Sequence, residues 1–461
     1  DLRPRAPEWP VFRFTDRLGS RNVDGVQVAI RGDFDKLTAD YRFDYTDSNN
    51  TGRAAQNLGI IPTDSTAGLV GGLWALTPLF GGTANQSVDR LKTVAAGTSE
   101  EHVETWGHSL TLEYKLNEAV KLKSISAFRG FEQDPNIYDL GATGGIRFSA
   151  TQLGVPAIPA FGIPGSGFLA GDLATVFGNP PGPHDYTYAL LTSRSTKQKQ
   201  FTQELQVQVS QEKYDLTAGI FYFHENSPAT DVLGIIQPIS NGVVVVNPLM
   251  DAIFGSGTSR SRAKNDSTAG YVQGTYHITD QWDVTAGMRY TEDEREVNIS
   301  EVAFAQGAAV PIGDYNFKFN KTNYNVVLAY KPSSNITAYA KVSTGYVAGG
   351  LLSGIPYNPE TLTSYELGLK SQLFDNRLRA NLAIFYSDYK DLQIQNFVNG
   401  AQTFENAGKA ALSGFELELM ALPMEGLTLD ANVGYTDTDY KKFLTTDPRL
   451  PLSPLGAGVI G

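Results

Sequence analysis

The chain has 461 residues, of which 41% are hydrophobic and 11% aromatic, and its formal net charge is −12. The lack of cysteine excludes a disulfide framework, a thiolate metal site and a cysteine nucleophile. The acidic balance argues against a nucleic-acid partner, which would need a basic stripe. The sequence contains no clean apolar stretch of about 18 residues that would predict a transmembrane helix.

An alternation of apolar and polar residues with a period of two predicts β-strands along the whole chain. The pattern appears first at 39–46 and is especially regular at 204–209, 282–291 and 427–436. It predicts about fourteen strands, at residues 22–33, 35–47, 103–117, 119–133, 197–211, 213–226, 265–279, 281–297, 314–331, 335–347, 361–374, 376–395, 402–421 and 426–442. Many of them exceed the roughly five to six residues of an average strand, so they suit tilted strands that cross a membrane.

The connections between these strands alternate in length. Every second one is a tight turn rich in Asp, Asn, Pro, Ser and Gly, as at 33–36, 279–281 and 374–376. The intervening connections are long, at 48–102, 134–196, 227–264, 298–313 and 348–360, and only 396–401 is short. In an up-and-down sheet alternate connections lie at opposite ends. The pattern therefore predicts an outer-membrane barrel with short periplasmic turns and long extracellular loops.

Aromatic residues support this interpretation because many of them fall near the predicted strand ends. Tyr41, Tyr290, Tyr346, Tyr386 and Tyr435 are examples. The two interfaces of a membrane favour amphipathic rings at such positions. The general preference of aromatic residues for strands explains their number but not their clustering at strand ends.

Several runs of the sequence resemble, in the right order, the barrel domain of TonB-dependent outer-membrane receptors. The strongest are Ala338–Tyr346 followed by Gly349-Gly350, Pro359–Lys370, Ala383–Gln393 and Gly414–Glu418, with Ala218–Phe223 and Ala286–Asp293 upstream. The resemblance extends over essentially the whole chain and is strongest after about residue 197. It implies an all-β, transmembrane, antiparallel up-and-down barrel, with about 14 strands present of a probable 22.

The resemblance also implies a domain organisation and a function. The family's N-terminal plug and its closing C-terminal strands are not recognised, so residues 1–461 are expected to form an incomplete barrel domain. The implied function is a receptor in the outer membrane that binds a scarce solute and imports it into the periplasm by TonB-dependent transport. Siderophore-bound iron, cobalamin, a carbohydrate or an aromatic compound would each fit as cargo. The expected partners are outer-membrane lipid, the cargo and, through the plug, the TonB complex; a monomeric barrel without a cofactor is expected.

Three other functions remain open from the sequence. A passive porin shares the same wall and needs no plug. An outer-membrane enzyme would need Ser, His and acidic groups that converge at one height of the wall, and we find no such constellation. A soluble adhesin-like β protein would partition into buffer rather than detergent.

Few motifs point to chemistry of another kind. The glycine-rich run at 165–171 lacks the following lysine of a phosphate-binding loop. The acidic run at 292–296 could hold Ca²⁺, although a solvated outer surface explains it better. Histidine occurs at 102, 108, 184, 224 and 277 without the spacing of a metal site, so ordinary polar positions are expected. The sequence therefore predicts neither a metal site nor a catalytic site.

Two groups of residues are candidates for contact with cargo or plug. The long loops are unusually apolar, and exposed apolar surface is costly. We therefore expect an apolar vestibule, with packing of loop on loop as the alternative. Its candidate ligand-facing residues are Trp74, Phe80, Tyr346 and Tyr357. The polar face of the strands predicts inward-facing wall residues, namely Asp40, Arg42, Glu204, Gln206, Arg289, Glu366, Arg379, Glu416 and Asp430.

Overall fold

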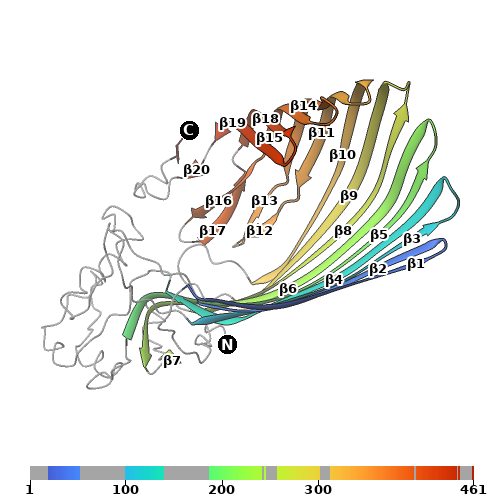
Figure 1. Ribbon diagram of the computed structural model, residues 1–461. Coiled ribbons are helices and arrows are strands. Elements are labelled where there is room, and N and C mark those ends of the chain that lie inside the picture. The colour runs from blue at the N-terminus through green and yellow to red at the C-terminus, as the bar shows by residue number, and fades with distance from the viewer. Residues whose placement is uncertain are drawn as a thin grey trace, which may run out of the picture.

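A computed structural model describes residues 19–51, 99–139, 186–240, 243–244, 257–301, 312–352, 354–398, 401–406, 408–443, 445–446 and 459–460. All regular structure in these segments is β-strand (Figure 1). Among the described residues, no helix is long and apolar enough to cross a membrane. The prediction of an all-β chain is confirmed.

The strands follow one another along a single antiparallel sheet. Fourteen of them pair in the order β1-β2-β3-β4-β5-β6-β8-β9-β10-β11-β14-β15-β18-β19, and β7 extends the sheet beside β6. This confirms the predicted up-and-down topology. The strands are β1 Arg21–Phe34, β2 Leu37–Thr51, β3 Glu100–Lys115, β4 Val120–Asp139, β5 Tyr186–Ser210, β6 Tyr214–Ser240, β7 Val243–Val244, β8 Gly257–His277, β9 Trp282–Glu301, β10 Gly313–Ser333, β11 Ile336–Val347, β12 Gly350–Leu352, β13 Ile355–Tyr357, β14 Glu360–Leu373, β15 Leu378–Lys390, β16 Gln393–Val398, β17 Ala401–Asn406, β18 Gly408–Met424, β19 Leu427–Phe443, β20 Thr445–Thr446 and β21 Val459–Ile460.

The two ends of the sheet differ in their connections. At one end, here called the turn end, consecutive strands are joined by tight turns such as 35–36 and 425–426. Backbone φ angles are positive in several of these turns, at Asp35, at Phe374 to Asn376 and at Gly426. The opposite end, here called the loop end, carries the long connections. The predicted segregation of turns and loops is therefore present.

Three strands are much longer than the sequence pattern indicates. β5, β6 and β8 have 25, 27 and 21 residues and extend into segments that we expected to be loop. The predicted loops 134–196 and 227–264 are thus too long. The physical reason is that strand extensions above a membrane are wet on both faces, so they lose the alternation that marks a lipid-facing strand.

The short connection predicted at 396–401 is also wrong. The main ladder stops at Lys390 and resumes at Gly408, and the residues between them include the separate hairpin β16–β17. Positive φ angles of 56° at Asp391 and 105° at Gly408 turn the chain out of the sheet. A second small hairpin, β12–β13, lies in the preceding loop-end connection.

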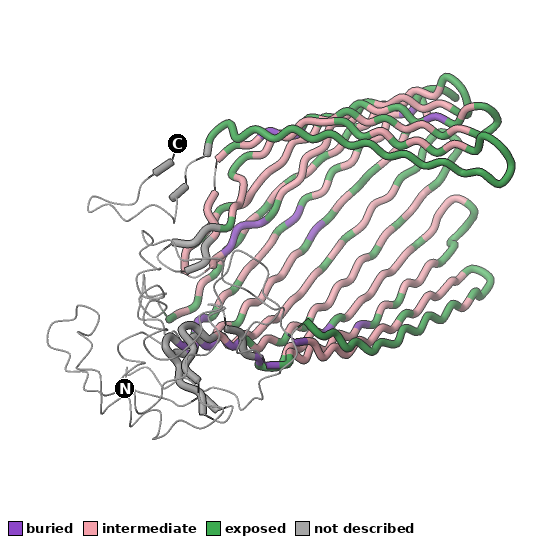
Figure 2. The backbone as a smooth tube through the Cα atoms, turned by 60° about the vertical axis from the view of Figure 1, so that its left-hand side comes forward, coloured by how far each residue is buried: buried purple, intermediate pink, exposed green. Residues whose placement is uncertain are grey.

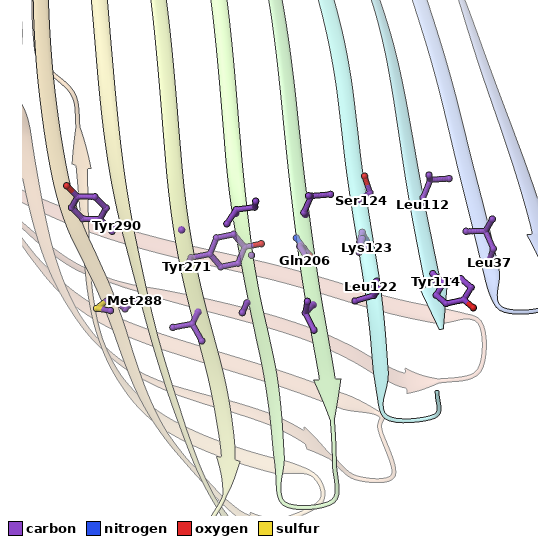
Figure 3. A pocket seen from close by; sticks show the side chains of 17 residues that line it. Leu37, Leu112, Tyr114, Leu122, Lys123, Ser124, Gln206, Tyr271, Met288 and Tyr290 are labelled. Carbon is purple, nitrogen blue, oxygen red and sulfur yellow. The ribbon is translucent and has the colours of Figure 1, made fainter. Parts of the chain in front are cut away.

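The sheet is a single layer with one apolar and one polar face. Leu205, Ile220 and Leu367 are 46%, 61% and 62% exposed on the outward face, whereas the neighbouring Glu204 and Gln206 are half-buried on the other face. Very few apolar side chains of the described segments are fully buried (Figure 2). The curl of the sheet sets β14, β15, β18 and β19 across from the first strands (Figures 1 and 3), so the polar face lines an interior. This is the architecture of a barrel wall, not of a soluble sandwich.

Glycines allow large inward rings to lie flat against the wall. Tyr271 pairs with Gly219 on the adjacent strand, and Tyr339 pairs with Gly368. A Cβ atom added to Gly219 would lie 2.6 Å from the Tyr271 hydroxyl, which is too close for any side chain. The two tyrosine rings therefore cover the glycines, and their hydroxyls reach carboxylates further along the wall.

Candidate functional site

A group of cations lies on the inward face of β9 and β10, toward the loop end. Arg289 and Arg295 come from β9 and Lys321 from β10, and all three alternate with exposed outward residues. The register places Lys321 opposite Thr291, between the levels of the two arginines. We call these three residues the inner cations.

Aromatic rings, not carboxylates, surround Arg289. Its guanidinium carbon is 5.1 Å from the centre of the Phe221 ring and 5.7 Å from that of Tyr271. Its Nε also donates a hydrogen bond of 3.2 Å to the Thr291 hydroxyl. Such stacking holds the guanidinium in place by cation–π attraction while leaving its charge uncompensated.

The nearby carboxylates are held by neutral donors. Tyr346 donates its hydroxyl hydrogen to Asp293, and Tyr271 donates to Glu204. Glu204 also accepts a 3.0 Å hydrogen bond from Gln206. Within the segments that the structure describes, none of the inner cations has a carboxylate within 4.0 Å. The inner cations and these carboxylates thus share this region of the interior without an ion pair between them.

The hairpin β12–β13 lies beside these cations. A Cβ atom added to Gly350 would lie 3.2 Å from Nη1 of Arg295 and 2.8 Å from the Tyr357 hydroxyl. A Cβ atom added to Gly349 would lie 2.9 Å from the Phe319 ring, which is on the inward face of β10. The Tyr357 ring is also 5.1 Å from that of Phe404. Aromatic groups and cations thus share one region of the interior.

Several charges of the interior toward the turn end are paired. Lys331 lies 2.5 Å from Asp283, which also contacts His277 at 2.7 Å. Lys123 lies 2.7 Å from Glu113 in the same way. A third pair, Lys341 and Glu366 at 3.4 Å, is joined by the Tyr339 hydroxyl at 2.6 Å from the same carboxylate. These groups stabilise the wall and leave little charge for a ligand.

The residues predicted from sequence have different positions. Glu204, Gln206, Arg289 and Glu366 are half-buried and take part in the contacts above. Trp74 and Phe80 lie outside the described residues. Tyr346 is in β11 rather than in a loop, and its hydroxyl contacts Asp293. The other predicted wall residues line the interior away from the inner cations, or stand at the edge strand, and are Asp40, Arg42, Arg379, Glu416 and Asp430.

Arg295 and Lys321 are not among the residues predicted from the sequence, and Asp293 was predicted only as part of the acidic run at 292–296. Arg295 lies six residues after Arg289, so the alternation itself placed it on the same face. The acidic run at 292–296 obscured this signal. In the structure the run divides, because Glu294 and Glu296 pair outward with Lys318 at 2.9 Å and with Lys264 at 3.1 Å, whereas Asp293 faces inward.

A groove on the outer surface of the described wall is not part of this site. It has a volume of about 910 Å³ and is lined mainly by outward apolar side chains of β2 to β9, among them Leu112, Leu122 and Met288 (Figure 3). Lys123, Gln206 and Tyr271 border it, although they belong to the inward face. Its apolar lining makes it a hollow in the outer belt rather than a cavity for a polar ligand.

Comparison with known proteins gives matches along nearly the whole chain. A family model described as "TonB dependent receptor-like, beta-barrel" matches residues 32–459. The pesticin receptor of Yersinia enterocolitica is 30% identical over 208 residues, which are 42% of this chain and 29% of that protein. The probable TonB-dependent siderophore receptor PiuA of Acinetobacter baumannii is 27% identical over 191 residues, 38% of this chain and 24% of that protein.

Solved structures show the same fold. The ferric yersiniabactin uptake receptor FyuA from Yersinia pestis has a TM-score of 0.61 at 16% identity, with 92% of this chain and 52% of that chain covered. The siderophore receptor PiuA from Acinetobacter baumannii has a TM-score of 0.60 at 16% identity, with coverage of 94% and 59%. The chain thus spans little more than half the length of these structures.

Proposed function

The chain belongs to the TonB-dependent receptor β-barrel family, and from this premise we propose that it is the wall of a receptor that imports a negatively charged iron–siderophore chelate. Its place is the bacterial outer membrane, and its function is binding and transport rather than catalysis. The turn end is then periplasmic and the loop end extracellular. Two of the similar proteins, the siderophore receptor PiuA and the ferric yersiniabactin uptake receptor FyuA, are named for cargo of this class.

The observation that carries the choice of cargo is the set of inner cations. The inner cations form no ion pair among the described residues, and such charges in a partly desolvated interior attract an anion much more strongly than charges on an open surface. Iron(III) is bound by hard, charged oxygen donors, and a chelate is anionic when its donor charges outnumber that of the metal. The rings of Phe221, Phe319 and Tyr357 beside the cations suit a chelate that also has flat organic groups.

We infer that transport past this site uses energy from the TonB complex through a plug inside the wall. The paired charges and amide groups of the turn end provide polar partners for such a plug. Uptake in cells without TonB tests this step. Binding should persist and uptake should stop, whereas a passive porin would continue to take up the solute.

The inner cations are tested with Arg289→Gln combined with Arg295→Gln. We expect the affinity for anionic iron chelates to fall about tenfold or more, equivalent to roughly 1.4 kcal/mol, because two attractive charges are lost. Binding of radioactive iron chelates to whole cells measures the effect. Lys318→Gln is the matched control, since Lys318 lies on the neighbouring strand but faces outward and pairs with Glu294 at 2.9 Å. Equal affinity in the double variant and the control would contradict the proposed cargo.

A further inference from the structure

A histidine and three carboxylates meet on the outward face of β2, β3 and β4, at the loop end. The Nε2 atom of His102 is 3.4 Å from Asp47 and 4.0 Å from Glu104. Its Nδ1 atom is 2.8 Å from Asp134. One ligand atom from each of Asp47, His102 and Glu104 lies within 4.8 Å of the other two. We call Asp47, His102 and Glu104 the outer triad.

The outer triad lies away from the interior cations. His102 and Glu104 lie on the same face of β3 as Trp106 and Leu110, and Leu110 is exposed on the outward face. Trp106 stacks on Phe128 at 5.2 Å, toward the middle of the wall from His102. These rings belong to the aromatic girdle, so the triad lies above it, at the level of the lipid head groups.

A further residue holds each member of the triad. Tyr45 donates a 2.9 Å hydrogen bond to Glu104, and Asn49 donates one of 3.1 Å to Asp47. Asp134 holds Nδ1 of His102, which directs Nε2 toward the two other carboxylates. Metal-binding histidines and carboxylates are oriented by outer contacts of this kind.

The local charge favours a bound cation. Asp47 and Glu104 stand directly opposite each other in the β2–β3 ladder, an arrangement of like charges that destabilises a sheet. Even a protonated His102 would carry a single positive charge against three carboxylates. Lys197, the nearby lysine, pairs with Glu132. In the described part of this surface the negative charge is therefore in excess.

We propose that the outer triad binds a divalent transition-metal ion of the zinc type, with His102 Nε2 and one oxygen each from Asp47 and Glu104 as ligands. Zinc bonds of about 2.0–2.2 Å place tetrahedral ligand atoms about 3.4 Å apart, close to the observed separation of His102 and Asp47. A small movement of the Glu104 side chain completes the set. The fourth position is open to water or to a phosphate of a neighbouring lipid. The ion would join β2 to β3 and, through Asp134, to β4.

The nitrogen ligand distinguishes this site from a general cluster of acids. Calcium and magnesium prefer about six to eight oxygen ligands, whereas imidazole with carboxylates suits zinc, nickel and copper. The competing interpretation is a protonated His102 that bridges the carboxylates without a metal. It predicts no stoichiometric binding of zinc.

Calorimetric titration of the intact receptor in detergent with zinc chloride tests the proposal, after removal of any polyhistidine tag. We expect one ion per chain with a dissociation constant in the micromolar range. His102→Gln and Asp47→Asn should each weaken binding about tenfold or more. The matched control is His224→Gln, because His224 also faces a carboxylate, Asp266 at 2.8 Å, but does not belong to the triad.

Titration with calcium chloride gives the second comparison. Calcium should bind much more weakly than zinc. Resistance of each variant to unfolding in detergent, read from its migration on gels without heating, shows that the barrel is intact. No zinc binding, equal binding in His102→Gln, or equal affinity for calcium would each overturn the proposal. None of these readouts depends on cargo uptake, so the result is independent of the proposed function.

Discussion

Tyr271 shows how a single side chain in this wall has both a structural and an electrostatic role. Its ring lies over Gly219 and beside Arg289, and its hydroxyl donates to Glu204. Glu204 therefore has a hydrogen-bond donor that is not a cation, and Arg289 forms no ion pair among the described residues. At the turn end the carboxylate of Asp283 is instead neutralised by Lys331. The choice of partner at the level of single residues thus decides which charges of the interior form ion pairs.

Substitution of Gly219 tests this arrangement. Gly219→Val should destabilise the receptor by about 1–3 kcal/mol, because the new Cβ would lie 2.6 Å from the Tyr271 hydroxyl and 2.8 Å from the Leu205 carbonyl oxygen. Denaturant unfolding followed by tryptophan fluorescence measures the change. Gly270→Val is the matched control, since Gly270 lies in the neighbouring strand with no atom within 4 Å of an added Cβ. Similar losses in both variants would mean that valine disturbs any glycine of the sheet and that the ring contact is unimportant.

The sequence predicts the inward position of a residue where the alternation within its own strand is sufficient. Arg289 and Glu204 are placed by alternation alone. The outer triad is different, because His102 shows no ligand spacing in the sequence. Its partners Asp47 and Asp134 come from other strands, and both lie far from His102 in the sequence. Only the register of β2 against β3 places Glu104 opposite Asp47. Sites that depend on register across long loops cannot be predicted from a pattern within one strand.

At the scale of elements, predictability ends where the membrane environment ends. Between the girdles one face of each strand meets lipid, and alternation marks all fourteen strands. Above the girdle both faces are wet. Residues 186–196 of β5 show no such alternation, although the ladder with β6 continues to Tyr186. The hairpins β12–β13 and β16–β17, which lie off the main sheet, were not predicted for a related reason. The polarity pattern does not show where φ becomes positive, as it does at Asp391.

A charge on the outward face tests the lipid contact of these elements. Leu367→Lys should destabilise the barrel by about 2–4 kcal/mol, because Leu367 is 62% exposed on the outward face and a lysine there would stand in hydrocarbon. Equilibrium unfolding in lipid vesicles measures the loss. The comparison is Asn381→Lys on the adjacent strand, which faces the interior and hydrogen-bonds Glu418 at 3.2 Å. A smaller loss for Leu367→Lys than for Asn381→Lys would show that the two faces are assigned the wrong way round.

At the scale of the whole molecule, the edges of the sheet limit how the wall can function. β1 and β19 are the edges, and no pairing joins them within the described residues. Both present apolar side chains outward, including Ile30 at 61% exposure and Leu429 at 54%. These edges therefore lie at the level of hydrocarbon, where unpaired backbone groups cost several kcal/mol each. We propose that further strands pair with β1 and β19 and close the barrel around a plug.

This proposal predicts different stability for the isolated wall and the whole receptor. Residues 1–461 refolded alone into detergent should lose the resistance to unfolding that closed barrels have, and should aggregate through β1 and β19. The whole receptor should keep a compact form on gels unless it is heated. Proline at Ala29 of β1 provides the finer test, because the N–H of Ala29 points away from β2. This backbone donor is free in an open edge but bonded in a closed barrel. The substitution should therefore destabilise the whole receptor by more than it destabilises the isolated wall. Equal effects in the two would mean that β1 is an edge strand in the functional protein as well.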